Sequence, residues 1–318
     1  QKEYRLNPKR CMAKLRNTPP PLKCRIPINT VREYFLAKQA ETNAGIPAGP
    51  PPVQIWPNAT PTDILEAPIT EDEVSKTLKQ MKANSAPGPD GLQYSAWKLV
   101  SPPIISTILN TCRINGKIPP LWKQSNTILI HKGGDPNNMD NWRPIALQNT
   151  LYKLYAAIIA RRVSTWVIAN NMLSPSQKGF LPYEGCLEHG FVLKSILQDS
   201  RRHKKKAFIA WLDIKDAFGS VPHRVLSEVL NLAGLQGTSL TVINDIYTDS
   251  STSVKTASDK TVPIPCLKGV KQGWPLSPIL FDLVIELVIR TMEKTPGAGY
   301  HIGHSNIKSL TYADDLCA

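Results

Sequence analysis

The sequence predicts a mixed α+β fold, and three observations carry this prediction. Runs rich in β-branched and aromatic residues, such as 126–131, 207–212 and 307–312, have the length and composition of strands. Apolar residues recur at helical spacing in two other stretches, 71–83 and 151–168. With 42% hydrophobic residues among 318, the chain can bury a substantial core.

The first 69 residues are predicted to be a basic extension followed by a proline-rich linker. Residues 1–24 carry seven lysines and arginines, and residues 43–69 are rich in Pro, Gly, Ala and Thr. Arg5, Lys9 and Arg10 are candidate phosphate contacts. A solvated terminal helix is the alternative interpretation.

The stretch 71–83 begins with a capping-box pattern, in which Thr70 precedes Glu73 by three residues, and is predicted to be an amphipathic helix. Lys76 and Lys79 share its polar face. They are candidate nucleic-acid contacts, although such a stripe is equally typical of a solvated surface.

A β-hairpin is predicted where the strand 126–131 reaches the turn signal 132–135 and a second strand-like run follows at 141–147. Lys132 and Arg143 then lie on the two sides of one turn. A triphosphate group needs cations of this kind, because Arg offers a planar fork and Lys a point charge.

Arg201, Arg202 and Lys204 belong to a basic cluster directly before the predicted strand 207–212. Such a cluster serves nucleic-acid backbone contact or nuclear import, with a plain solvated turn as the alternative.

Three acids suggest a metal-dependent centre for phosphoryl transfer. Asp213 ends one predicted strand, and Asp314 and Asp315 follow another, 101 residues later (314 − 213). Two divalent cations roughly 3.5–4 Å apart need carboxylates that converge from different strands. Neighbouring residues of a strand point to opposite faces, so we rank Asp314 above Asp315 as a ligand. A polar hairpin tip is the alternative.

Two further segments bear on nucleotide binding. Phe218 lies five residues beyond Asp213, where a bulky ring can exclude a 2′-hydroxyl; a core position is the alternative. In the glycine-rich run 269–278, Gln272 and Gly273 allow an amide hydrogen bond and close backbone approach to a nucleotide. The helix that follows is predicted to have Ser277 as N-cap and Pro278 in its first position.

Composition favours a polyanionic partner. The 38 Lys and Arg against 25 Asp and Glu give a formal charge of +13, which suits a nucleic-acid backbone. Membrane binding is disfavoured, since charges interrupt the apolar windows 151–167 and 276–292 and no signal peptide is visible. The six cysteines form no Cys-x-x-Cys pair, which argues against a zinc ribbon.

Taken in order, these segments resemble the reverse transcriptases of non-long-terminal-repeat (LINE-type) retrotransposons, and within them the early-branching class that inserts into ribosomal RNA genes. The resemblance covers about residues 63–318. It lies in eight collinear blocks: 85–91 (SAPGPDG), 129–135 (LIHKGGD), 141–147 (NWRPIAL), 152–154 (YKL), 177–180 (QKGF) with Gly185 and Cys186, 213–223 (DIKDAFGSVPH), 269–278 (GVKQGWPLSP) and 312–315 (YADD).

The resemblance implies a right-hand polymerase fold, with fingers at 70–205 and a palm at 206–318, behind the N-terminal extension 1–69. The thumb is absent from these residues. It also implies a role for each candidate site residue. Two Mg²⁺ would be bound by Asp213, Asp314 and Asp315 with the carbonyl of Ile214, and the triphosphate by Lys132 and Arg143. Phe218 would be the sugar gate, and Gln272 with Gly273 would form part of the nucleotide and template pocket.

Two positions depart from the family pattern. Trp274 stands where the family usually has a small or acidic residue, which could reshape the pocket. Gly219 stands where many members have a second Asp, which leaves the ligand positions intact.

The implied activity is template-directed copying of RNA into DNA, primed at a nick in target DNA and fed by deoxynucleoside triphosphates. The family's endonuclease, thumb and zinc knuckle are not in these residues, so we expect a fragment with weak or no processive synthesis by itself. Nuclear localisation, with cytoplasmic assembly on RNA, follows by the same resemblance. Two alternatives remain: a decayed RNA-binding relic, and a reverse transcriptase of the group II intron maturase type.

Overall fold

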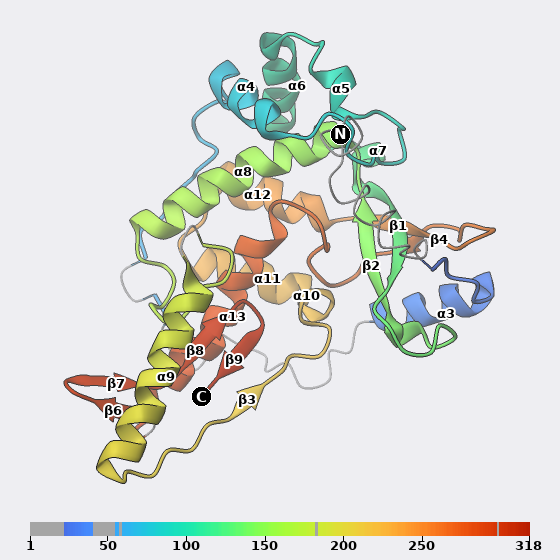
Figure 1. Cartoon of the computed structure of the whole chain (residues 1–318). Coiled ribbons are helices and arrows are strands. Elements are labelled where there is room, and N and C mark those ends of the chain that lie inside the picture. The colour runs from blue at the N-terminus through green and yellow to red at the C-terminus, as the bar shows by residue number, and fades with distance from the viewer. Residues whose placement is uncertain (1–21, 41–54, 57–58, 182–183, 298) are drawn as a thin grey trace, which may run out of the picture.

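A computed structural model describes residues 22–40, 55–56, 59–181, 184–297 and 299–318 (Figure 1). The candidate phosphate contacts Arg5, Lys9 and Arg10 lie outside the described residues. The described chain mixes helices and sheets, which confirms the predicted α+β class.

The largest sheet has the strand order β2-β1-β4-β5. Its first two strands, β1 (Gln124–His131) and β2 (Trp142–Leu147), form the predicted hairpin, closed by the 3-10 turn η1 (Met139–Asn141). On the other edge of β1, β4 (Ser251–Lys255) pairs in parallel and β5 (Ile264–Pro265) completes the sheet.

A smaller sheet lies at the other side of the core, in the order β3-β9-β8. Its strands are β3 (Trp211–Leu212), β9 (Asp315–Cys317) and β8 (Leu310–Tyr312). Nearby, β6 (Tyr300–Ile302) and β7 (Ser305–Ile307) form a separate hairpin. The strand predicted over 207–212 is paired only over its last three residues: Trp211 and Leu212 pair with Cys317 and Leu316, and Ala210 exchanges backbone hydrogen bonds with Ala318.

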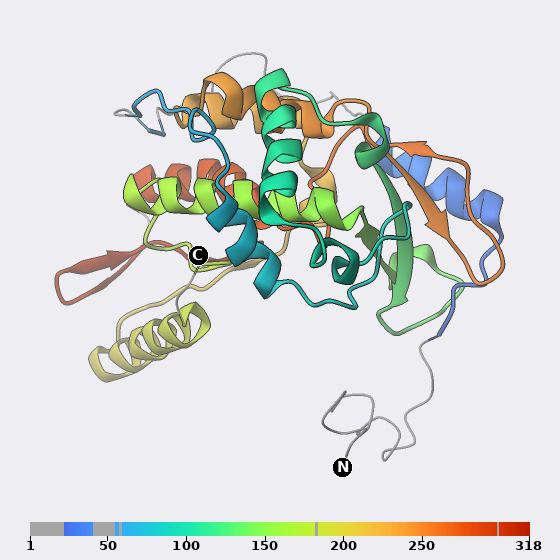
Figure 2. The same cartoon turned by 90° about the horizontal axis from the view of Figure 1, so that it is seen from above.

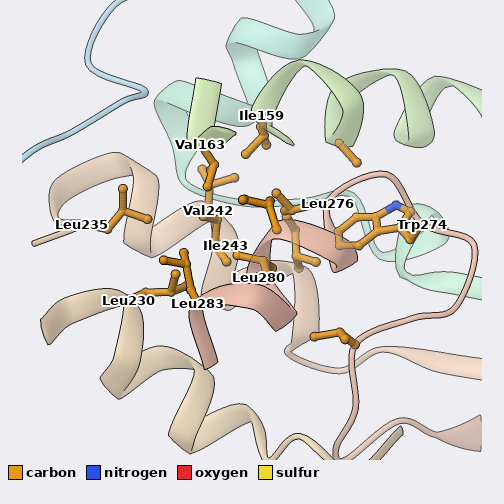
Figure 3. Packing of buried hydrophobic residues seen from close by; sticks show 14 of the residues in the cluster. Ile159, Val163, Leu230, Leu235, Val242, Ile243, Trp274, Leu276, Leu280 and Leu283 are labelled. Carbon is orange, nitrogen blue, oxygen red and sulfur yellow. The ribbon is translucent and has the colours of Figure 1, made fainter. Parts of the chain in front are cut away.

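Four helices build the core between the two sheets (Figures 1 and 2). They are α8 (Thr150–Ala169), α11 (His223–Leu232), α12 (Gly237–Tyr247) and α13 (Ser277–Lys294). Figure 3 shows side chains of all four meeting there, among them Ile159, Leu230, Val242 and Leu280. This core contains residues from both sides of the predicted boundary at position 205. The division into fingers and palm stays a prediction.

The helices α4 (Glu71–Gln80), α5 (Tyr94–Trp97) and α6 (Pro102–Asn115) cover α8 on the side away from α13 (Figure 1). The predicted capping box is present, since Thr70 Oγ1 accepts from Glu73 N–H and the Glu73 carboxylate accepts from Thr70 N–H. The helix stops at Gln80 rather than at 83, because Met81 already has an extended backbone.

Helix α3 (Ile28–Gln39) has no counterpart in the sequence analysis, which treats residues 1–69 as extension and linker. Its buried Val31 and Phe35 pack with Trp142, Val254 and Ile264 against the large sheet. Part of the N-terminal extension is thus folded onto the sheet.

The remaining helices are shorter connections or lie at the periphery. Helix α7 (Pro120–Lys123) leads into β1, and α10 (Ala217–Ser220) follows β3. Helix α9 (Gly185–His203) lies beside β8, at the end of the molecule far from α3 (Figures 1 and 2). Within the described residues, no helix combines the length and apolar character that a membrane crossing requires.

Arg162 of α8 joins α8 to α4 and to the segment before it. Its guanidinium donates to both carboxylate oxygens of Glu73 at 2.7 and 2.8 Å, and to the carbonyls of Ile64, Ala67 and Pro68. Burial alone would raise the pKa of Glu73, but the hydrogen bonds of Arg162 and Thr70 lower it.

We predict that Arg162→Ala lowers the free energy of unfolding by about 2–3 kcal/mol, because several charge-assisted hydrogen bonds are lost together. Chemical denaturation measures the change. Arg161→Ala on the same helix is the control: Arg161 donates one exposed bond to Gln80, so we expect a loss of about 0.5 kcal/mol or less. Equal losses in the two variants would contradict the assignment.

A second stability test comes from Asp282 of α13, which is 0% exposed and whose two carboxylate oxygens have no hydrogen-bond partner among the described residues. Burial, with a smaller contribution from Glu286, raises the pKa of Asp282 from 3.8 to about 8. The stability that the neutral carboxyl contributes is therefore fully present below the unfolded pKa and is lost as pH rises through about 8.

Asp282→Asn should remove this pH dependence, since an amide does not titrate. We expect the variant to gain stability over the wild type as pH rises from 5 to 9, by more than about 1 kcal/mol at pH 9, since one pKa unit corresponds to about 1.4 kcal/mol. Thermal unfolding at several pH values measures the difference. Asp259→Asn, at an exposed turn, is the control and should show no such trend. A constant difference between Asp282→Asn and wild type across this pH range would refute the assignment.

Candidate active site

The smaller sheet brings the distant acids to one edge. Leu212 pairs with Leu316, so the same antiparallel register, continued by one residue, sets Asp213 across from Asp315. Asp315 in turn pairs with Tyr312, which leaves Ala313 and Asp314 as a two-residue turn between β8 and β9. The pairing of β3 with β9 therefore places Asp213, the residue after β3, beside the hairpin that carries Asp314.

The three carboxylates are accessible: Asp213 and Asp315 are exposed and Asp314 is half-buried. No salt bridge joins any of them to a lysine or arginine in the described part of the chain. The described residues nevertheless contain no group of three or more metal-ligating side chains close enough to hold an ion. The assignment of Asp213, Asp314, Asp315 and the Ile214 carbonyl as metal ligands therefore stays a prediction.

The loop after Asp213 is fixed by contacts with α3. Lys38 Nζ lies 3.2 Å from a carboxylate oxygen of Asp216, and the Tyr34 hydroxyl donates to Asp140 at 2.6 Å on the β1–β2 hairpin. Burial alone would lower the pKa of Lys38, but Tyr34 and Asp216 raise it. Gln39 Oε1 accepts from the backbone N–H of Leu267. Helix α3 thereby links the hairpin, the loop after Asp213 and the backbone just before the glycine-rich run.

Gly219 is explained by crowding in this loop. A Cβ there would lie 2.6 Å from an Asp216 carboxylate oxygen. The backbone of Gly269 also lies close to Gly219, since a Cβ added at position 269 would lie 2.9 Å from Gly219 Cα. A second acid at position 219 would therefore displace Asp216.

Lys132 and Arg143 lie on the two sides of the β1–β2 turn, as predicted. Lys132 N–H donates to the Asn141 carbonyl, next to the His131–Trp142 pair, and Arg143 pairs with Ile130 one step further along the hairpin. Both side chains are exposed, and Lys132 Nζ donates to the Asp140 carbonyl at 3.2 Å. Their contact with a triphosphate stays a prediction.

The glycine-rich run contacts this hairpin. The Gln272 carbonyl accepts from Ala146 N–H on β2 at 3.3 Å, and Gly273 has a φ of 87°, a conformation that side chains with a Cβ adopt at a cost. Gln272 Oε1 is buried without a partner among the described residues. Gln272 also lines a cavity of 110 Å³ together with Lys38 and Asp216.

Phe218 is held between two other aromatic rings. Its ring stacks on Phe281 of α13 at a centroid distance of 4.8 Å and an interplanar angle of 12°. Phe180 meets it edge-on at 5.9 Å. The side chain is only partly buried, so the packing fixes the ring while one part of it remains accessible.

Trp274 belongs to the core, not to the pocket. It is 3% exposed and lies among the buried side chains of the core (Figure 3). Its ring centroid lies 5.3 Å from that of Tyr152 and 6.1 Å from that of Tyr247. The Trp274 side chain therefore does not line the cavity that Gln272 lines, and its effect on a nucleotide site stays a prediction.

The predicted N-cap of α13 is wrong by one residue. Helix α13 already includes Ser277, and its N-cap is Leu276. A turn directly before the helix shifts its start by one residue: Ser277 N–H donates to the Trp274 carbonyl, and Leu276 has helical dihedral angles. Pro278 is therefore the second helical residue.

The basic candidates lie on two separate surfaces. Lys76 and Lys79 are exposed on α4, where Lys76 pairs with Asp72, whereas Arg201, Arg202 and Lys204 are exposed at the end of α9. Figure 1 places these helices at opposite ends of the molecule. Their contacts with nucleic acid stay predictions.

Sequence reasoning did not assign any site role to Lys38, Gln177 or Gly179. In the sequence, the block 177–180 indicates the class of retrotransposon and predicts no contact with the site. In the structure it lies against the turn that carries Asp314: Lys178 N–H donates to Thr311 O, and Thr311 N–H to Ser176 O.

Comparisons with known proteins agree with the resemblance. The family model described as reverse transcriptase (RNA-dependent DNA polymerase) matches residues 130–318. A Retrovirus-related Pol polyprotein from type-1 retrotransposable element R2 of Popillia japonica is 34% identical over 250 residues, which are 78% of this chain and 34% of that protein. The corresponding polyprotein from type-2 element R2DM of Drosophila melanogaster is 30% identical, over 78% of this chain and 23% of that protein.

The chain thus spans about a third or less of the length of these relatives. Among solved structures, apo telomerase from Candida tropicalis, truncated from its C-terminal domain, is similar with a TM-score of 0.41 and 14% identity. The similarity covers 71% of this chain and 49% of the telomerase chain.

Proposed function

Because this chain belongs to the reverse transcriptase (RNA-dependent DNA polymerase) family, we propose that it catalyses RNA-templated DNA synthesis for a non-long-terminal-repeat retrotransposon. The observation that carries the proposal is the register that sets Asp213 across from Asp315, beside Asp314 in its turn. This arrangement supplies carboxylates from separate strands at one sheet edge.

The available donors fit Mg²⁺, since carboxylate oxygens are the ligands that it prefers and these three have no protein cation as a partner in the described residues. Asp213, Asp314 and Asp315, with the Ile214 carbonyl, would hold two ions. When bound, the ions supply neutralisation of the charge that develops at the phosphate during transfer.

The chain's own residues then bind and orient the substrates. The 3′-hydroxyl of a primer attacks the α-phosphate of a deoxynucleoside triphosphate, and pyrophosphate leaves. Lys132 and Arg143, which flank the β1–β2 turn, contact the leaving phosphates, and Gln272 and Gly273 border the nucleotide and its template base.

In this proposal the wider partners are the element's RNA and a nick in target DNA, within ribosomal RNA genes and in the nucleus after assembly with RNA in the cytoplasm. The relatives named for R2 retrotransposable elements support the part of the proposal that assigns the chain to a retrotransposon. The exposed basic residues of α4 and α9 provide separate surfaces for nucleic-acid backbones.

Replacing a metal ligand tests the activity. Asp213→Asn or Asp314→Asn should reduce Mg²⁺-dependent deoxynucleotide incorporation on an RNA template at least about 1000-fold, because the neutral amide no longer counters the cation's charge. RNA affinity should stay unchanged. Asp249→Asn is the control, since Asp249 is exposed and its left-handed backbone suits Asn. Normal turnover in either ligand variant would show the assignment to be wrong.

Phe218 provides a separate test of substrate choice. Phe218→Val should raise incorporation of ribonucleotides relative to deoxynucleotides at least about tenfold, because a smaller side chain leaves room for the 2′-hydroxyl. Single-nucleotide incorporation with each sugar measures the ratio. Phe281→Leu is the control for lost ring packing, since Phe281 is 2% exposed and stacks on Phe218. An unchanged ratio in Phe218→Val would rule out the gate.

A further inference from the structure

The turn that carries Asp314 has an unusual backbone. Ala313 is its first residue and has a φ of 57°, in the left-handed region that any residue with a Cβ adopts at a steric cost. Two-residue hairpin turns with positive φ only at this position normally have glycine there. Ala313 is also 3% exposed, so water does not readily satisfy its backbone groups.

Gln177 satisfies those groups from a neighbouring segment. Its Oε1 accepts from Ala313 N–H at 2.9 Å, and its Nε2 donates to the Ala313 carbonyl at 3.4 Å. The same Oε1 accepts from Gly179 N–H at 2.8 Å. The Gln177 side chain is 1% exposed, so its amide group is oriented by these contacts rather than by solvent.

The segment that holds Gln177 is itself fixed. Ser174 N–H donates to the buried Glu286 carboxylate of α13, and Ser176 Oγ donates to Glu293 at 2.6 Å. His189 Nε2 lies within hydrogen-bond distance of the Ser176 and Thr311 carbonyls, at 2.9 and 3.1 Å. Gln177 therefore reaches the turn from a segment anchored to α13 and α9.

Gly179 allows this close approach. A Cβ at position 179 would overlap the backbone nitrogen of Ala313. The block 177–180 thus covers the turn with backbone on one side and the Gln177 amide on the other.

We propose that Gln177 is a positioning residue that holds Ala313 in its left-handed conformation and so directs the Asp314 carboxylate. The inference rests on the proposed function, in which Asp314 is a metal ligand. Gln177 touches neither substrate nor metal and acts through the turn.

Gln177→Leu removes all three side-chain hydrogen bonds, to the Ala313 N–H, the Ala313 carbonyl and the Gly179 N–H, while nearly keeping the side-chain volume. We expect primer extension to fall about 10- to 100-fold, since small misplacement of a reacting group costs this much. The Mg²⁺ concentration for half-maximal activity should rise at least about threefold. RNA affinity should not change.

Glycine at position 313 gives the sharpest control. Because glycine adopts positive φ without a Cβ penalty, Ala313→Gly in the Gln177→Leu background should restore at least about a third of the lost activity and the Mg²⁺ dependence. Gln198→Leu makes the same change at an exposed position of α9 and removes no contact with the turn. It should leave the Mg²⁺ midpoint unchanged.

Amide hydrogen exchange at Ala313 provides a measurement that needs no activity. The amide should be protected in the wild type and exchange at least about tenfold faster in Gln177→Leu, with thermal unfolding recorded to exclude global loss of fold. Fast exchange in both proteins, an unchanged Mg²⁺ midpoint, or no rescue by Ala313→Gly would overturn the proposal. Normal turnover in Asp314→Asn, together with a protected Ala313 amide, would instead count against the proposed function, and the turn-holding contact would stand.

Discussion

The antiparallel register between β3 and β9 is the constraint on which the candidate active site depends. Leu212 faces Leu316 and Trp211 faces Cys317, and this pairing brings the loop after Asp213 to the hairpin that carries Asp314. A shift by one residue would turn every side chain of β3 to the opposite face of the sheet. Leu316 of β9 is buried in the core, whereas Trp211 and Leu212 of β3 are exposed, so side-chain burial holds β9 in place and β3 is held by its backbone pairing with β9.

The core behind this sheet makes the rest of the site rigid. Helix α13 contributes to three parts of it: Phe281 stacks on Phe218, Glu286 and Glu293 anchor the segment at Ser174 and Ser176, and the helix follows directly from the glycine-rich run. One buried helix thus positions the candidate sugar gate, the segment beside the acidic turn and the nucleotide pocket. A change within α13 would therefore affect all three at once.

Helix α3 extends the same principle to the other side of the site. It packs on the large sheet through Val31 and Phe35, and its polar residues Tyr34, Lys38 and Gln39 contact the hairpin, the loop after β3 and the backbone before the glycine-rich run. Because β4 also joins β1 in one sheet, residues before and after the candidate catalytic strand share a single support.

The sequence by itself determined what depends on local chemistry. The capping box at Thr70 and Glu73, the hairpin from β1 to β2 and the long helix α8 follow from residues close together in the chain, and the family follows from eight collinear blocks. Only the tertiary structure decided the rest, because it depends on which distant segments meet. Trp274 lies in the core with Tyr152, α3 folds back onto the sheet, and Gln177 contacts Ala313 across 136 residues. No local pattern records these contacts, since burial and hydrogen-bond partners are set by long-range packing.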